Sequence, residues 1–194
     1  MRSRFLFLFI AFPIFVHTAS GQCFDTKAWD DVSKIGSKDK DGHTMEEYCT
    51  AFIGCSMPTF SAVTVDGSKI SNTILHGKVT VFYFWDLHNN LNVSEASYLN
   101  KLVDTFKTDN VRLIAICIND SAKWDKRSEK FFHFQHIARS KDMLSKFKGY
   151  PTIIIFDKNG KTVYYNIAWE SKDHLNSTDR TPTFIEVIRK ALRE

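Results

Sequence analysis

The stretch KVTVFYFWDLHNNLNVSEASYL, residues 78–99, decides how the chain folds. Residues 79–85 are all β-branched or aromatic, which favours a strand. Because this apolar run does not alternate with polar residues, we expect a central strand that is buried on both faces. A polar loop then leads into a helical pattern, and a strand that runs into a helix N-terminus is a common place for chemistry, since unbonded backbone N–H groups point there. In this chain His88, Asn89 and Asn92 occupy that place.

The N-terminus has the pattern of a secretory signal peptide over residues 1–21. Residues 5–16 are apolar, but this stretch of 12 residues is too short to cross a bilayer. Residues 19–21 are small and suit cleavage, so we expect the mature chain to begin at about Gln22. The alternative is a retained membrane anchor. We expect an exported protein, periplasmic or extracellular, with no stable membrane insertion after cleavage.

Length and charge limit the classes of function. A chain of 194 residues is long enough for one domain with a substantial core. We place an N-terminal extension with a short helix at residues 22–53 and one domain at residues 54–194. The formal net charge is +4, and loss of Arg2 and Arg4 with the signal peptide lowers it to +2. A charge this small, with acidic and basic residues interspersed, gives no electrostatic case for nucleic-acid binding.

Patterns along the chain predict an α/β protein. A capping box at residues 44–47 opens a short helix that ends at Gly54, and Asp66-Gly67 marks the turn of a hairpin. Residues 111–118 form a second buried-strand run, so the helix before it implies a right-handed parallel crossover. The other expected elements are helices at 95–107, 123–132, 141–147 and 181–192, strands at 59–65, 68–71, 152–157 and 161–167, and a loop at 168–180. Together they predict a mixed sheet covered by helices.

The chain has four cysteines, and their pairing matters because disulfides persist in exported proteins. Cys117 lies inside a buried-strand run and is expected to be an inert core thiol. Cys23, Cys49 and Cys55 precede the main fold. A continuous helix would separate the Cα atoms of Cys49 and Cys55 by about 9 Å, beyond disulfide reach, although a reversal at Gly54 could close the gap. Cys23 is a rival partner for either, so the pairing stays open.

The order of several short motifs resembles one family. The motifs are Pro58-Thr59-Phe60, Asp66-Gly67, Gly77-Lys78, FYFW at 82–85, Leu99-Asn100-Lys101-Leu102, Gly149-Tyr150-Pro151-Thr152 and Phe156-Asp157-Lys158-Asn159-Gly160. Together they resemble the TlpA/ResA-type branch of the thioredoxin-like superfamily, whose members are extracytoplasmic thiol–disulfide oxidoreductases. The resemblance covers residues 53–194 and implies a thioredoxin-like fold, a mixed central β-sheet flanked by helices, with an N-terminal β-hairpin extension.

In that family a Cys-x-x-Cys pair at the start of the helix exchanges disulfides. The helix N-terminus lowers the pKa of the first thiol, and the second thiol resolves the mixed disulfide. With no gap between Trp85 and Glu95, the two cysteine positions fall on Asn89 and Asn92, and the residue before them is His88. An asparagine amide forms neither a thiolate nor a disulfide. The resemblance therefore implies a degenerate site without a confident catalytic residue.

Simpler roles remain open for these residues. Asn89 or Asn92 could serve simply as the cap of the helix, since asparagine is a good N-cap. His88 could be an exposed loop residue, because no nucleophile is visible beside it.

Other features of the family's site are retained. Pro151 matches the proline that is cis in this fold and that lies beside the bound peptide. Glu95 matches a helix acid of this branch, and Tyr83 occupies the place of a buried aspartate in ordinary thioredoxins. The resemblance thus implies a groove for a peptide or protein partner, formed by Trp85, His88, Glu95, Tyr150 and Pro151.

Two hypotheses follow from these residues. The first is an exported thioredoxin-fold protein that is redox-inactive at the usual site and acts as a binding or accessory module. The alternative is an extracytoplasmic thiol–disulfide oxidoreductase or antioxidant enzyme that uses Cys49, Cys55 or Cys23. His133 and His136 are spaced to share a helical face, but without a third ligand we expect no metal site. No cofactor is implied.

Overall fold

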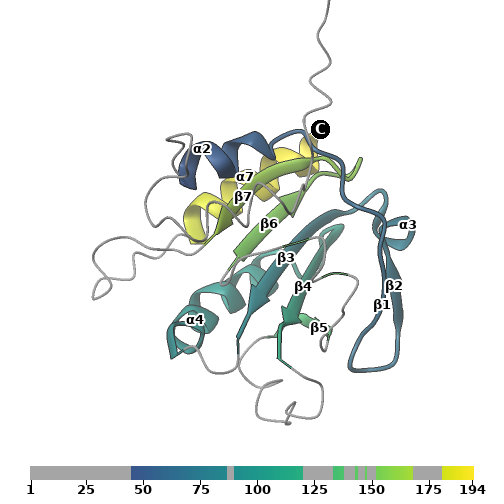
Figure 1. Cartoon of the computed structure of the whole chain (residues 1–194), viewed down its shortest axis with the longest axis vertical. Coiled ribbons are helices and arrows are strands. Elements are labelled where there is room, and N and C mark those ends of the chain that lie inside the picture. The colour runs from purple at the N-terminus through teal and green to yellow at the C-terminus, as the bar shows by residue number, and fades with distance from the viewer. Residues whose placement is uncertain are drawn as a thin grey trace, which may run out of the picture.

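The computed structural model describes residues 45–86, 90–119, 133–137, 143, 147, 152–167 and 181–194. A five-stranded mixed sheet forms the centre, with strand order β5-β4-β3-β6-β7 (Figure 1). The strands are β3 (Val79–Trp85), β4 (Val111–Cys117), β5 (Gln135–Ile137), β6 (Thr152–Phe156) and β7 (Thr162–Ile167). β3 pairs in parallel with β4 and antiparallel with β6, and β6 pairs antiparallel with β7. The predicted mixed sheet is confirmed.

The central strand β3 is buried along its whole length, as its unbroken apolar run predicts. Its side chains alternate between two hydrophobic clusters on opposite faces of the sheet. On one face, the ring of Phe82 packs against the rings of Phe60, Phe84, Phe147 and Phe156, with centroids between 5.5 and 6.3 Å apart. Through Phe60, this aromatic cluster joins the sheet to the segment that precedes it in the chain.

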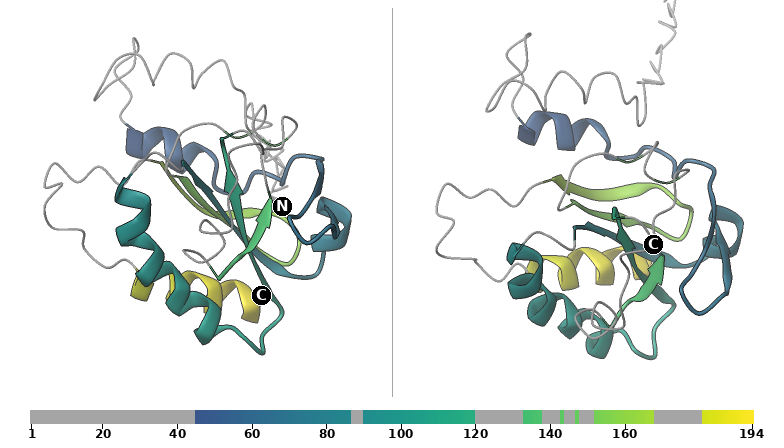
Figure 2. Two further views of the ribbon diagram at one scale, coloured as in Figure 1. Left: turned by 90° about the horizontal axis from the view of Figure 1, so that it is seen from below. Right: turned by 60° about the horizontal axis from the view of Figure 1, so that its bottom comes forward.

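Helices cover both faces of the sheet. α4 (Asn90–Thr105) and α7 (Thr181–Arg193) lie on one face, and α2 (Met45–Ala51) lies on the other (Figure 2). Just after α2, the ring of Phe52 stacks on Tyr165 of β7 with the ring centroids 4.7 Å apart. The sheet is therefore the middle of three layers.

An antiparallel hairpin precedes the sheet, as the turn signal at residues 66–67 predicts. β1 (Ser61–Val63) pairs with β2 (Lys69–Ser71) in a separate two-stranded sheet. Gly67 in the turn has φ +85°, a conformation that residues with a side chain rarely adopt. α3 (Asn72–Leu75), a short helix directly after β2, is not predicted by the sequence.

The main differences from the sequence prediction are two helix ends and one additional strand. α4 begins at Asn90 rather than at residue 95, because residues 90–94 alternate between polar and apolar side chains, which hides the helical period. α2 ends at Ala51, before the predicted end at Gly54. Residues 135–137 form β5, which no pattern predicted, since three residues carry too little periodicity.

Several predictions fall where the structure gives no description. The signal peptide at 1–21, the helix at 123–132 and the loop at 168–180 lie outside the described residues, as does most of the helix predicted at 141–147. Within the described part of the chain, no helix is both long and apolar enough to cross a membrane.

Candidate functional site

Four chain segments meet at one edge of the sheet. β3 and β4 are parallel, with Trp85 opposite Cys117, so their carboxyl ends lie side by side. β6 runs antiparallel to β3, with Thr152 opposite Phe84, which brings the start of β6 to the same edge. α4 begins at Asn90, shortly after β3 ends. Ligands of α/β proteins commonly bind at the carboxyl ends of the strands, so this edge is the candidate site.

The structure places two of the five residues predicted for the groove. Trp85 and Glu95 are buried, with exposed fractions of 2% and 6%. Asn92 lies in the first turn of α4, where only the backbone is described. The site residues outside the described part of the chain are His88, Asn89, Tyr150 and Pro151. The groove itself therefore stays a prediction.

A buried pair of polar side chains links α4 to β3 next to this edge. The Tyr83 hydroxyl donates a hydrogen bond to Glu95 Oε2, with 2.6 Å between the oxygens. Burial raises the pKa of the Glu95 carboxyl, and the hydrogen bond from Tyr83 offsets only part of that rise. Burial also raises the pKa of Tyr83 well above its usual value, and the negative charge of Glu95 adds to the shift. Burial thus disfavours the charged form of each group.

The periods of the strand and the helix explain why these two side chains meet. Tyr83 and Trp85 are two residues apart on β3, so both point toward the face that α4 covers. Glu95 lies one helical turn before Leu99, which packs in the same cluster, and it therefore faces the sheet. The resemblance singled out Tyr83 and Glu95 separately, but it did not predict their contact.

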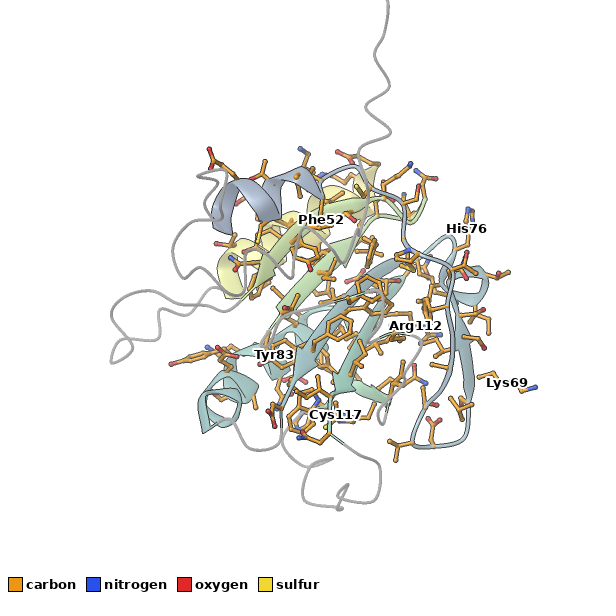
Figure 3. The ribbon with its side chains drawn as sticks, viewed as in Figure 1. Phe52, Lys69, His76, Tyr83, Arg112 and Cys117 are labelled. Carbon is orange, nitrogen blue, oxygen red and sulfur yellow. The ribbon has the colours of Figure 1, made fainter. Side chains whose placement is uncertain are left out.

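A buried thiol lies at the same edge, at the end of β4 (Figure 3). Cys117 is 1% exposed, which confirms the prediction that it belongs to the core. Its Sγ donates to Asn119 Oδ1 at 3.4 Å, and Asn119 Nδ2 donates to Asp86 Oδ1 at 3.0 Å. Sequence reasoning missed that this thiol lies beside Trp85, although the predicted parallel crossover carried that signal. Because Sγ is covered, a disulfide substrate cannot reach it, and Cys117 does not supply the missing nucleophile.

The two histidines do not share a helical face, although their spacing would allow it. His136 lies in β5 opposite Ala115, and its ring packs edge-on against Trp85 with the ring centroids 6.4 Å apart. His133 precedes the strand, and its backbone N–H donates to Asn100 Oδ1 at 2.8 Å. Among the described residues, no three His, Cys, Asp or Glu side chains are grouped so that they could hold a metal ion.

Cys55, one of the two described N-terminal cysteines, lies at the opposite end of the sheet. The Cys55 carbonyl accepts a hydrogen bond from the Thr162 N–H at the start of β7, at 2.8 Å. Thr162 pairs with Phe156, which pairs in turn with Thr80 near the start of β3. Cys55 is disulfide-bonded, whereas Cys49 carries a buried thiol, so these two cysteines are not joined to each other. This excludes one of the pairings that the sequence left open.

Comparisons with known proteins agree with the observed fold. The sequence model of the AhpC/TSA family matches residues 53–165. The thioredoxin domain of a thiol-disulfide oxidoreductase from Bacteroides vulgatus matches with TM-score 0.57 and 21% identity, over 70% of this chain and 97% of that chain. A thiol:disulfide interchange protein of the thioredoxin family from Chlorobium tepidum matches with TM-score 0.57 and 20% identity, over 71% and 95% of the two chains.

A third solved structure, an uncharacterized conserved protein from Geobacillus kaustophilus, matches with TM-score 0.61 and 18% identity, over 73% of this chain and 82% of that chain. No curated protein sequence matches significantly. The structural matches show the fold, and the expected thioredoxin-like fold, with a mixed central sheet flanked by helices, is confirmed.

Proposed function

This chain belongs to the AhpC/TSA family, and we propose that it is an exported member of TlpA/ResA type whose usual redox site has lost its cysteines. In this proposal the site acts as a binding or accessory module for a peptide or protein partner. The observation that carries the proposal is the pair of asparagines between two anchored positions, the end of β3 and the second turn of α4.

The two anchors support an ungapped comparison with the family's motif. Trp85 is the last residue of the central strand, and Glu95 is hydrogen-bonded to that strand through Tyr83. Between the anchors, the cysteine positions fall on Asn89 and Asn92. Because α4 begins at Asn90, the first position directly precedes the helix and the second lies in its first turn. Thiols at these positions would be activated by the helix N-terminus, and asparagine amides cannot be.

The other described cysteines offer no substitute. Cys117 is at the right edge but is 1% exposed, and Cys49 is 8% exposed and lies on α2. Cys55 is already in a disulfide and pairs with the start of β7, at the far end of the sheet. Disulfide exchange needs a thiolate that its substrate can reach, so these positions support a site without redox chemistry.

A binding role suits this edge for physical reasons. The N-terminus of α4 offers backbone N–H groups that have no partner within the helix. Thr152, which follows Pro151 in the sequence, starts β6 opposite Phe84. We expect an extended peptide to add main-chain hydrogen bonds there. Trp85 and Glu95 are buried, so their role in this groove is to support it rather than to contact the peptide.

Turnover by the purified mature chain tests the loss of redox function. In an insulin-reduction assay with dithiothreitol, we expect the chain that starts at Gln22 to match the uncatalysed rate. A higher rate that Cys49→Ser or Cys55→Ser abolishes would instead support the alternative, an oxidoreductase that uses the N-terminal cysteines. Cys117→Ala is the matched control, because it removes a buried thiol at the other end of the sheet.

Export has its own test. When the full chain is expressed with its first 21 residues, we expect the mass of the secreted product to correspond to a start at about Gln22. A product that keeps these residues and sediments with membranes would support the retained anchor.

A further inference from the structure

We propose that Cys55 forms its disulfide with Cys23. This bond would fasten the N-terminal extension to β7, the outer strand of the sheet. Cys55 is disulfide-bonded, whereas Cys49 and Cys117 carry thiols. The chain has four cysteines, so Cys23 remains as the partner within the chain. Cys23 lies outside the described residues, and the assignment therefore rests on the states of the other three.

The backbone around Cys55 is hydrogen-bonded to the start of β7, the outer strand of the sheet. The Gly54 N–H donates to Thr162 O at 2.8 Å, and Thr162 donates to Cys55 O through both its N–H, at 2.8 Å, and its Oγ1, at 3.0 Å. Ser56 forms an antiparallel bridge with Lys161. These contacts cover the outer side of the chain where β7 begins, and they hinder pairing of that part of the edge with another chain. An anchor at Cys55 is therefore an anchor to the sheet.

The surroundings of Cys55 suit a permanent bond rather than a catalytic one. Cys55 is 7% exposed, so that a reductant has little access to its sulfur. Cys49, the nearest other cysteine in the sequence, is buried on α2, and the stacking of Phe52 on Tyr165 holds the end of that segment on β7. Burial of both side chains opposes exchange between the Cys49 thiol and the disulfide. The bond does not depend on the proposed loss of the redox site, because neither Asn89 nor Asn92 takes part in it, but its formation rests on the proposed export.

Formation of the bond requires an oxidant, which we take to be a protein or low-molecular-weight disulfide of an oxidising compartment. A thiolate of one cysteine attacks that disulfide and forms a mixed disulfide, and the thiolate of the other cysteine then displaces the oxidant's sulfur. Cys23 and Cys55 together lose two protons and two electrons, and the oxidant leaves as two thiols.

Peptide mapping of the full chain, exported to an oxidising compartment, tests the pairing directly. Thiols are alkylated at low pH before digestion so that no exchange occurs. Trypsin leaves Cys49 and Cys55 on one peptide, because residues 41–68 contain no lysine or arginine, and chymotrypsin is added to cut after Phe52. We expect the Cys23 peptide linked to the Cys55 peptide, with Cys49 and Cys117 alkylated. A link from Cys49 to either cysteine, or between two chains, would overturn the proposal.

Single serine variants give a second readout. Under denaturing conditions we expect two thiols in the wild type, three in Cys23→Ser or Cys55→Ser, and one in the matched control Cys49→Ser. Loss of a bond that closes a loop of about 30 residues should lower the Tm of Cys23→Ser by ~10 °C. A Cys23→Ser chain with only one thiol would show that Cys55 pairs with another cysteine of the chain, and a disulfide-linked dimer with two thiols per chain would show that it pairs between chains. If this variant does not fold, the map of the wild type still decides the question.

Discussion

At the scale of single residues, the hydrogen bond between Tyr83 and Glu95 holds α4 against the central strand at the candidate site. Both side chains lie in a layer that is otherwise apolar, with Leu99 and Ile153 among its members. A buried polar atom that loses its partner there costs about 1–3 kcal/mol. The contact is therefore structural, and it sets where the start of α4 lies relative to the end of β3.

Removal of the phenol hydroxyl should weaken the fold. In Tyr83→Phe the Glu95 carboxyl stays buried without its donor, and we expect the free energy of unfolding to fall by about 1–3 kcal/mol. Tyr164→Phe on β7 is the matched control, because its half-buried hydroxyl only accepts a bond from Asn166, and we expect a change within about 0.5 kcal/mol. Urea denaturation measures both. Equal effects of the two substitutions would contradict the role of the pair.

Glu95 should also make stability depend on pH. Burial raises the pKa of its carboxyl in the folded chain above the unfolded value, so the folded chain binds the proton more tightly. The resulting stabilisation is complete below the unfolded pKa and is lost as the pH rises through the folded pKa. Glu95→Gln does not ionise but can still accept from Tyr83. We therefore expect the wild type to lose stability relative to Glu95→Gln from acidic pH toward neutrality, and parallel urea-denaturation profiles would contradict this.

At the scale of elements, the sequence predicts those segments whose local signal is long or sharp. The unbroken apolar run of β3 and the Asp-Gly turn between β1 and β2 are enough to place both. β5 and α3 have three and four residues, so neither shows a period. Residues 90–94 of α4 alternate between polar and apolar side chains, so the helical period becomes visible only from residue 95, and the predicted helix starts too late.

The aromatic cluster around β3 should dominate the stability of the sheet. Phe82 is fully buried and contacts four other rings, so Phe82→Ala leaves a large cavity, and we expect the free energy of unfolding to fall by about 3–5 kcal/mol. Ile74→Ala is the control, since Ile74 is 47% exposed and should change stability by no more than about 0.5 kcal/mol. Chemical denaturation monitored by circular dichroism compares them. Similar losses for the two variants would show that Phe82 is not a core residue.

At the scale of the whole molecule, two different sites lie at opposite ends of the sheet. The carboxyl ends of β3 and β4 form the candidate binding edge, and the start of β7 holds the disulfide-bonded Cys55 at the other end. The predicted parallel crossover anticipates the first of these, because it joins the ends of two buried strands. Neither the position of Cys117 beside Trp85 nor the exclusion of a Cys49–Cys55 bond could be predicted with certainty, since both depend on register and on contacts between distant segments.

The central claim is that Asn89 and Asn92 occupy the two cysteine positions of the family's redox motif. Substitution of both by cysteine tests this claim most directly. The measurement is the insulin-reduction rate of Asn89→Cys/Asn92→Cys, beside the wild type and the matched control Asn89→Ser/Asn92→Ser. We predict a measurable rate for the double-cysteine variant only, because its first thiol would directly precede the N-terminus of α4. A folded double-cysteine variant that carries both new thiols and yet shows no reductase activity would contradict the assignment of these two positions.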